Sequence, residues 1–217
     1  MLKPQLIPAT VNNYPTIQNL ARFYVYDLSR SCGRDSVDWA VPLDGLYESF
    51  DFKNYFEEVS RKAFLIKVGE ELAGFVLLNQ VATSSDIDWN IGEFFILARF
   101  QGQGIGQLVV QELWSIHPGR WEVAVVPENK SALAFWRKTI SAFTNGLYSE
   151  TEKKIDYDVD QPKRIILNFD TNKPDAQDIE QKMSLNITFV DQLSEALEEY
   201  MTNDLIAYER SYGIDVN

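Results

Sequence analysis

Hydrophobic and polar residues recur with two periods along the first half of the chain, one near 3.6 residues and one of two residues. Between Tyr14 and Ser31 the apolar positions follow the longer period, which predicts an amphipathic helix. A β-hairpin is expected where Ala63–Val68 and Leu72–Leu78 flank a Gly69-Glu70 turn. The same pattern predicts a short strand at Leu6–Ile7 ending near Pro8, a helix at Leu46–Val59, and loops at Ser36–Gly45 and Thr83–Asp88.

Strands and helices alternate in the next part of the pattern. A strand-like run at Glu93–Leu97 precedes an amphipathic helix at Ile105–His117, which Pro118-Gly119 ends. The elements predicted after it are a strand at Trp121–Val126, a helix from near Asn129, and strands near Leu147–Ile155 and Arg164–Phe169. Periodicity alone therefore predicts an α/β protein.

The composition shifts after Asp170. Residues 171–182 are expected to form a linker, because they include the Asn172-Lys-Pro-Asp175 stretch. Beyond it, the pattern predicts a strand at Leu185–Val190 and a helix from Asp191 to about Arg210. This strand–helix unit is either an extension of the first domain or the start of another domain, and the pattern leaves both open.

The chain is acidic, with 32 Asp and Glu against 20 Lys and Arg and a net charge of −12. This charge argues against sequence-independent binding of nucleic acid, which depends on neutralising phosphates with Lys and Arg. The charge suits either a cationic substrate such as an amine or simple solubility, and solubility is the leading interpretation. A hydrophobic content of 45% and an aromatic content of 13% support a globular core.

Membrane segments, disulfides and metal sites are not expected. No apolar run approaches the roughly eighteen residues that a membrane span needs, and the N-terminal residues lack the pattern of a secretory signal. The cytoplasm is therefore the expected location. The only cysteine, Cys32, and the only histidine, His117, exclude a disulfide framework and any Cys- or His-cluster metal site. The oligomeric state stays open, with a homodimer among the options.

A glycine-rich stretch, Gln101-Gly-Gln-Gly-Ile-Gly106, lies between the strand at Glu93–Leu97 and the helix that follows. Such a turn exposes backbone N–H groups at the positive end of the helix dipole, which suits a phosphate or pyrophosphate. A P-loop would need Lys followed by Ser or Thr after the last glycine, where Gln107-Leu108 stands. A dinucleotide fingerprint needs Gly-x-Gly-x-x-Gly, and the spacing here is different.

The loop resembles the pyrophosphate loop of the GNAT N-acetyltransferase superfamily, Gln/Arg-x-x-Gly-x-Gly/Ala. Further along, Asn129, Ala132 and the pair Phe135-Trp136 resemble the next motif of that family. The resemblance covers roughly residues 1–170 and implies the GNAT fold, a twisted mixed β-sheet with helices on both faces in the order β-α-α-β-β-β-α-β-α-β-β. Residues 183–217 resemble the start of a second, truncated GNAT domain.

The resemblance implies acetyl-CoA as the co-substrate. Its pyrophosphate would bind the N–H groups of the loop, and its pantetheine arm would lie along the preceding strand, where two strands of this family splay apart. A backbone N–H near Ile96 would hold the thioester oxyanion. The residues assigned to the cofactor are Phe95, Ile96, Leu97, Ala98, Gln101, Gly102, Gln103, Gly104, Ile105, Gly106, Gln107, Asn129, Phe135 and Trp136.

By the same resemblance, a neutral primary amine attacks the thioester directly. Because amines of lysine type titrate at about 10, a base is needed, and Glu93 is the candidate, acting through a water. The alternative is that Glu93 faces solvent or pairs with a basic residue. Asp86 and Asp88 would bind the ammonium of the substrate or lie in a solvated loop. Many relatives protonate the thiolate with a Tyr where Trp136 stands, and Tyr148 is the candidate replacement.

Three functions fit these features. The leading one is an acetyl-CoA-dependent N-acetyltransferase that acts on a primary amine of a small molecule or a protein. The second is a non-catalytic acetyl-CoA-binding regulatory module, which Trp136 in place of the usual acid keeps open. The third, an interaction protein without cofactor, is disfavoured because the glycines of the loop are intact.

Overall fold

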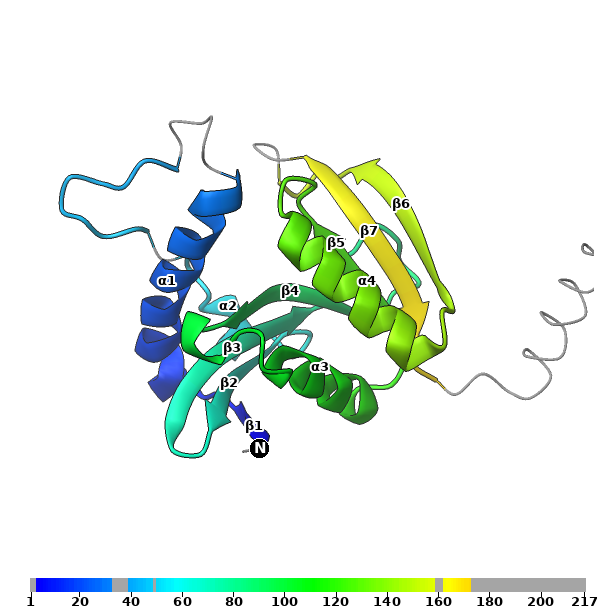
Figure 1. Ribbon diagram of the computed structural model, residues 1–217, viewed down its shortest axis with the longest axis horizontal. Helices are drawn as coiled ribbons and strands as arrows, with labels where there is room; N and C mark the ends of the chain where they lie inside the picture. Colours follow the sequence, from blue (N-terminus) through cyan, green and yellow to red (C-terminus); the bar gives the residue numbers. More distant parts are fainter. Residues whose placement is uncertain (1–2, 33–38, 49, 159–161, 173–217) are drawn as a thin grey trace, which may run out of the picture. The chain divides into compact units, whose positions relative to one another are not determined.

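The computed structural model describes residues 3–32, 39–48, 50–158 and 162–172 (Figure 1). A compact unit spans Met1–Asn172, and the structural description concerns that unit. Almost all of the predicted linker at 171–182 and the whole strand–helix unit at 183–217 lie outside the described residues. Within the described ranges, no helix has the length and apolar character needed to cross a membrane.

A mixed β-sheet of seven strands forms the centre of the unit. Its order is β1-β2-β3-β4-β5-β7-β6, and all neighbouring strands are antiparallel except β4 and β5. The strands are β1 (Pro4–Pro8), β2 (Lys62–Val68), β3 (Glu71–Asn79), β4 (Trp89–Ile96), β5 (Arg120–Val125), β6 (Tyr148–Lys154) and β7 (Lys163–Asp170). The predicted mixed sheet is confirmed, and so is the β2–β3 hairpin.

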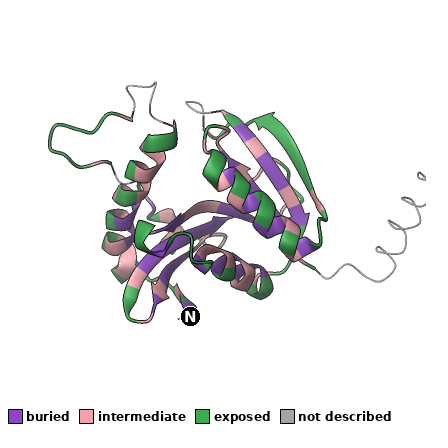
Figure 2. Cartoon of the chain, viewed as in Figure 1, coloured by how far each residue is buried: buried purple, intermediate pink, exposed green. Residues whose placement is uncertain are grey.

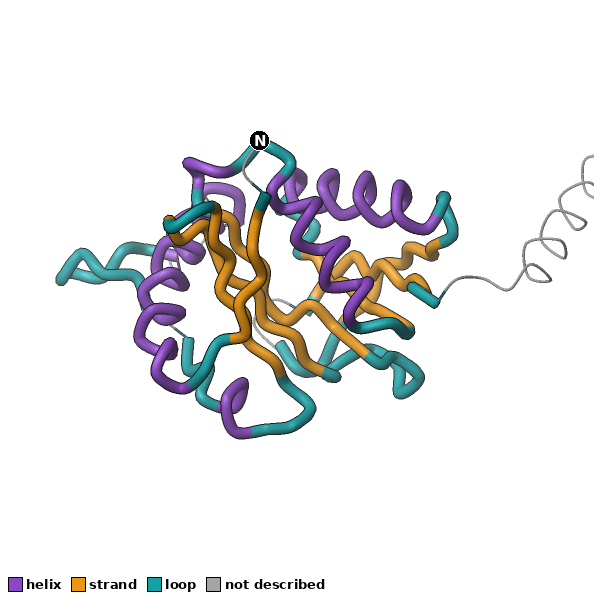
Figure 3. Tube along the Cα trace, turned by 90° about the horizontal axis from the view of Figure 1, so that it is seen from below, coloured by secondary structure: helices purple, strands orange, loops and turns teal. Residues whose placement is uncertain are grey.

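Helices cover both faces of this sheet, as Figures 1 and 3 show. They are α1 (Tyr14–Cys32), α2 (Asn54–Glu57), α3 (Ile105–Ile116) and α4 (Lys130–Thr144), with short 3₁₀ turns η1 (Val11–Asn13) and η3 (Ala98–Phe100). One hydrophobic core joins α3 and α4 to the sheet, and a second core joins α1 and the α2 region to the opposite face. Figure 2 shows the buried residues concentrated along the strands between these layers.

The prediction of a helix at Leu46–Val59 is wrong over most of this range. Only Asn54–Glu57 is helical. The residues before it are held by contacts with α1 instead of by helical hydrogen bonds. Arg22 donates to the Tyr47 carbonyl, and Asp51 accepts hydrogen bonds from the Tyr14 hydroxyl and a backbone N–H. Phe52 is thereby inserted into the core, and tertiary contacts override the helical spacing of the aromatic residues.

The central strand also differs from its prediction. It begins at Trp89, four residues before Glu93, and ends at Ile96, so that Leu97 and Ala98 lie outside it. The β3–β4 register shifts between Leu77 and Leu78, whose partners are Glu93 and Ile91, which leaves Gly92 as the extra residue of a β-bulge. A Cβ on Gly92 would lie 2.3 Å from the Tyr55 hydroxyl and 2.6 Å from the Asn79 amide nitrogen, so any larger residue would force these side chains to move.

Candidate functional site

Strands β4 and β5 are paired at one end and separated at the other. Their parallel register contains only Trp89↔Trp121 and Asn90↔Glu122. Beyond Asn90, β4 is bonded to β3 alone. The Leu97 N–H donates to the Ala73 carbonyl at 2.8 Å. In an antiparallel pair, every second residue forms backbone hydrogen bonds with the partner strand, so the N–H and C=O groups of Phe94 and Ile96 point away from β3. These groups form an open strand edge, in agreement with the gap that the family resemblance implied.

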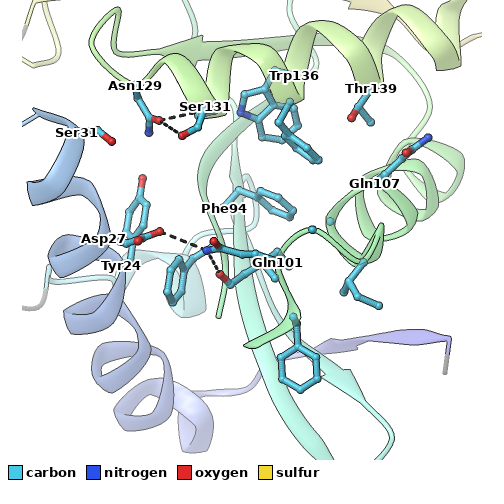
Figure 4. A pocket seen from close by; sticks show the side chains of 18 of the residues that line it. Tyr24, Asp27, Ser31, Phe94, Gln101, Gln107, Asn129, Ser131, Trp136 and Thr139 are labelled. Atoms are coloured by element: carbon cyan, nitrogen blue, oxygen red, sulfur yellow. Dashed lines mark hydrogen bonds between the residues drawn. The ribbon is translucent and has the colours of Figure 1, made fainter. Parts of the chain in front are cut away.

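A cavity of about 520 Å³ lies beside this edge, between α1, the glycine loop and α4 (Figure 4). Most of the residues assigned to the cofactor line it. They are Phe95, Ile96, Gln101, Gly102, Gly104, Ile105, Gly106, Gln107, Asn129, Phe135 and Trp136. Leu97, Ala98 and Gln103 do not. The strand ends before Leu97 and Ala98, and the Gln103 side chain turns back to the Arg99 carbonyl.

The glycine loop has the geometry of an anion site. Gly104 is the N-cap of α3 with φ of 79°, and Gly102 has φ of 72°, both in the left-handed region that favours glycine. No atom lies within 4 Å of a Cβ built on either glycine, so the space beside them is open. A helix N-terminus and free backbone N–H groups meet in this space, which fits a diphosphate.

Gly106 serves a different purpose from the other two glycines. A Cβ there would come within 3.3 Å of the Phe135 ring on α4. The missing side chain therefore allows α3 and α4 to approach at the cavity. Phe135 in turn stacks on Phe94 with ring centroids 5.8 Å apart, and Trp136 packs against both rings.

Gln101 ties the loop to its surroundings. Its side-chain amide donates to the Ile96 carbonyl at 2.7 Å and to Asp27 of α1 at 3.3 Å. The side chain thus bonds one of the open groups of the β4 edge. Asn129 is the N-cap of α4 and accepts a hydrogen bond from the Ala132 N–H at 3.1 Å. Its side-chain oxygen bonds the helix backbone, and its side-chain NH2 group lies beside the cavity.

Glu93 lies on the α1 side of β4, opposite Leu77 and two residues before Phe95. Its carboxylate is half-buried and interacts through a hydrogen bond with the Tyr24 hydroxyl of α1. Burial raises the pKa of Glu93 to about 7, opposed by the Tyr24 hydrogen bond and by the charge of Arg164. A carboxyl group with this pKa can accept a proton at neutral pH, as a general base must.

Glu93 does not itself line the cavity, whereas Tyr24 does. Burial raises the pKa of Tyr24 well above its usual range, and the charge of Glu93 adds to the shift. Tyr24 lies within the helix predicted at Tyr14–Ser31, and the periodic pattern alone does not show that it borders the cavity. Its position follows from the packing of α1 on β4, which no local pattern encodes.

The remaining candidates lie elsewhere. Tyr148 begins β6 opposite Phe169, which pairs with Trp121, so it lies level with the closed end of β4 and β5 and outside the cavity. Asp86 pairs with the Arg120 side chain at 2.8 Å, and Asp88 accepts the Arg120 N–H at 2.8 Å. Both aspartates thus hold the β3–β4 connection at that same closed end.

Comparison with known proteins adds the family. Residues 24–140, more than half of the chain, match the family model described as "Acetyltransferase (GNAT) family". No curated protein matches the sequence.

Solved structures with the same fold include an acetyltransferase from Thermus thermophilus, with a TM-score of 0.54 and 17% identity over 78% of this chain and 97% of that one. The RimL ribosomal L7/L12 alpha-N-protein acetyltransferase in complex with coenzyme A has a TM-score of 0.52 and 16% identity, over 78% of this chain and 95% of that one. A mutant of the spermidine N-acetyltransferase SpeG from Vibrio cholerae has a TM-score of 0.50 and 14% identity, over 80% of this chain and 98% of that one. With its splayed strands, glycine loop and matching family model, the chain belongs to the GNAT family of acetyltransferases.

Proposed function

We propose that the protein transfers the acetyl group of acetyl-CoA to a primary amine by direct attack. The observation that carries this proposal is the cavity where the open edge of β4 meets the N-terminus of α3. The open space at Gly102 and Gly104 fits the diphosphate. The backbone groups of Phe94 and the Ile96 N–H at the open edge of β4 fit an extended arm with amide groups, whereas the Ile96 carbonyl is bonded by Gln101.

Each part of the reaction has a candidate on this chain. Acetyl-CoA supplies the thioester when it is bound. The N–H groups at the open edge of β4 can stabilise the negative charge that develops on its oxygen. Glu93, through a water, takes the proton that the attacking nitrogen gives up. Phe94, Phe135 and Trp136 form the apolar wall that keeps bulk water away.

The acceptor is proposed only as a class. Among the proteins with this fold, one is described as acting on ribosomal L7/L12 and another on spermidine, so both protein and small-molecule amines belong in a screen. The acidic character of the chain is compatible with a cationic acceptor.

The test joins calorimetry with a turnover assay on the full chain. Wild-type protein should bind coenzyme A and release free thiol from acetyl-CoA with at least one amine from a panel of polyamines, small amines and peptides. Gly104→Val should abolish both, because a side chain there is strained at φ of 79° and fills the diphosphate space. Gly45→Val is the matched control, since Gly45 has φ of 76° in open space at a distant turn.

Two results would contradict the proposal in different ways. Wild-type protein that binds no coenzyme A would refute the assignment of the cavity. Binding without turnover on any amine would favour the non-catalytic regulatory module, for which the buried Trp136 in place of a proton donor is the supporting observation.

A further inference from the structure

The proposed transfer needs a proton donor for the sulfur that leaves, and the cavity offers few. Trp136 is buried and its indole N–H releases no proton at accessible pH. The titratable side chains that line the cavity are Tyr24, Asp27, Arg30 and Lys138. Asp27 is held by an ion pair with Arg30 and by Gln101, and Lys138 is exposed on α4. Tyr24 is the one phenol among the described residues that line the cavity.

The position of Tyr24 is fixed by aromatic packing. Its ring lies 5.6 Å from the Phe95 ring and 6.1 Å from the Phe75 ring, edge-on to the latter. Figure 4 shows the side chain projecting from α1 toward the space bounded by Phe94 and Asn129. On the sheet side, the hydroxyl interacts electrostatically with Glu93, which lies two residues before Phe95 on β4. Tyr24 therefore stands between the cavity and the carboxylate.

We propose that Tyr24 is the catalytic acid and that Glu93 returns a proton to it, a relay that rests on the proposed acetyl transfer. The nitrogen lone pair forms the N–C bond, and the C–S bond breaks with its electron pair going to sulfur. The nitrogen gives one proton to Glu93 through a water. Tyr24 gives its hydroxyl proton to the sulfur and receives the proton from Glu93. The products are the acetamide and the free thiol, and both side chains end as they began.

The relay explains how a tyrosine that holds its proton tightly can act as an acid. Alone, Tyr24 would transfer a proton uphill to a thiolate, because a thiol has a pKa of about 8.5. When Glu93 returns a proton to Tyr24, the net proton transfer runs from a carboxyl group of pKa about 7 to that thiolate, which is energetically favourable. The charged and titratable groups that face this pair are Cys32 on α1, Tyr55 on α2, Asp158 before β7 and Arg164 on β7.

The kinetic test compares Tyr24→Phe with Tyr26→Phe. Both remove one hydroxyl from α1, but Tyr26 is 65% exposed and packs on Tyr47 outside the cavity. Tyr24→Phe should lower kcat roughly 100-fold, the usual effect of losing a general acid, while the Kd of acetyl-CoA stays the same. Tyr26→Phe should leave kcat unchanged. Difluorotyrosine at position 24 lowers the pKa of the phenol. It should therefore move the alkaline limb of the kcat–pH profile to lower pH.

A second measurement does not depend on turnover. The Tyr24 hydrogen bond lowers the pKa of Glu93, so Tyr24→Phe should raise that pKa in a carbon-13 NMR titration of the free protein. An unchanged Glu93 pKa would overturn the relay. So would unchanged kcat in an active Tyr24→Phe variant, with the proposed acetyl transfer left intact. If Tyr24→Phe does not fold, an unmoved alkaline limb in the fluorinated protein would overturn it. Wild-type protein that transfers acetyl to no amine would refute the proposed function and the relay together.

Discussion

At the scale of single residues, the proposed chemistry of this site depends on one carboxylate and its surroundings. Glu93 follows the bulge at Gly92 and lies under α1, where burial raises its pKa from the ordinary value of 4.5 to about 7. Ionised Glu93 is the form that accepts a proton, so we expect turnover to rise with pH through about 7. The raised pKa also affects stability. Between pH 4.5 and 7 the folded protein holds a proton that the unfolded chain has released, and stability therefore falls as the pH rises through this window.

The substitution Glu93→Gln tests both consequences. It should lower kcat by roughly 100-fold, as the loss of a general base does, and leave the Kd of coenzyme A unchanged. It should also raise the melting temperature relative to wild type at pH 8 but not at pH 4.5, because the cost of burying a charge disappears. Turnover equal to that of wild type would exclude Glu93 as the base. A stability difference that does not vary with pH would show that its pKa is ordinary.

At the scale of elements, the important feature is that β4 separates from β5 after two residue pairs. The separation is possible because the β4 edge keeps its antiparallel bonds with β3 and because Gln101 bonds the Ile96 carbonyl. Trp89 and Trp121 pack against each other at the closed end, with ring centroids 6.3 Å apart. The gap is thus a stable part of the sheet, supported on one side by β3 and on the other by α4.

Amide hydrogen exchange can test this edge one residue at a time. The Ile96 N–H faces the gap, whereas the Leu97 N–H already donates to Ala73. Coenzyme A should therefore slow exchange at Ile96 by more than tenfold and change exchange at Leu97 little, since a new backbone bond forms only at the open edge. Equal protection at both amides would indicate general tightening of the protein instead of an arm bound along β4.

At the scale of the whole unit, two groups of strands must be held together although few bonds join them directly. α3 and α4 pack across both groups in one core. On the opposite face, Glu122 of β5 is fully buried and accepts hydrogen bonds from the N–H and hydroxyl of Thr83 in the β3–β4 connection. Glu122 is the register partner of Asn90, so this anchor lies where the two groups meet.

The anchor predicts a large effect of Glu122→Ala on stability. The change removes the acceptor of two Thr83 donors at a partly buried site, which costs about 1–3 kcal/mol of unfolding free energy. Urea denaturation measures it, and Glu152→Ala on the exposed strand β6 is the control, expected within about 0.5 kcal/mol of wild type. A loss below about 1 kcal/mol for Glu122→Ala would mean that the contact with Thr83 contributes little.

The sequence by itself determined the features that depend on neighbours along the chain. The apolar period of α3, the hairpin of β2 and β3, and the left-handed glycines of the loop are local, because periodicity and φ are properties of short segments. The same local signals identified the family and half of the residues that line the cavity. They failed at Leu46–Val59, where hydrogen bonds from α1 replace the helix.

Only the tertiary structure decided which side chains meet. Tyr24 borders the cavity and interacts electrostatically with Glu93 because α1 packs across β4. Tyr148 lies away from the cavity because its pairing with β7 places it at the closed end of the gap. The pKa of Glu93 has the same origin, since burial under a distant helix produces it. Contacts between segments far apart in the chain depend on packing and register, and no single stretch of sequence contains either.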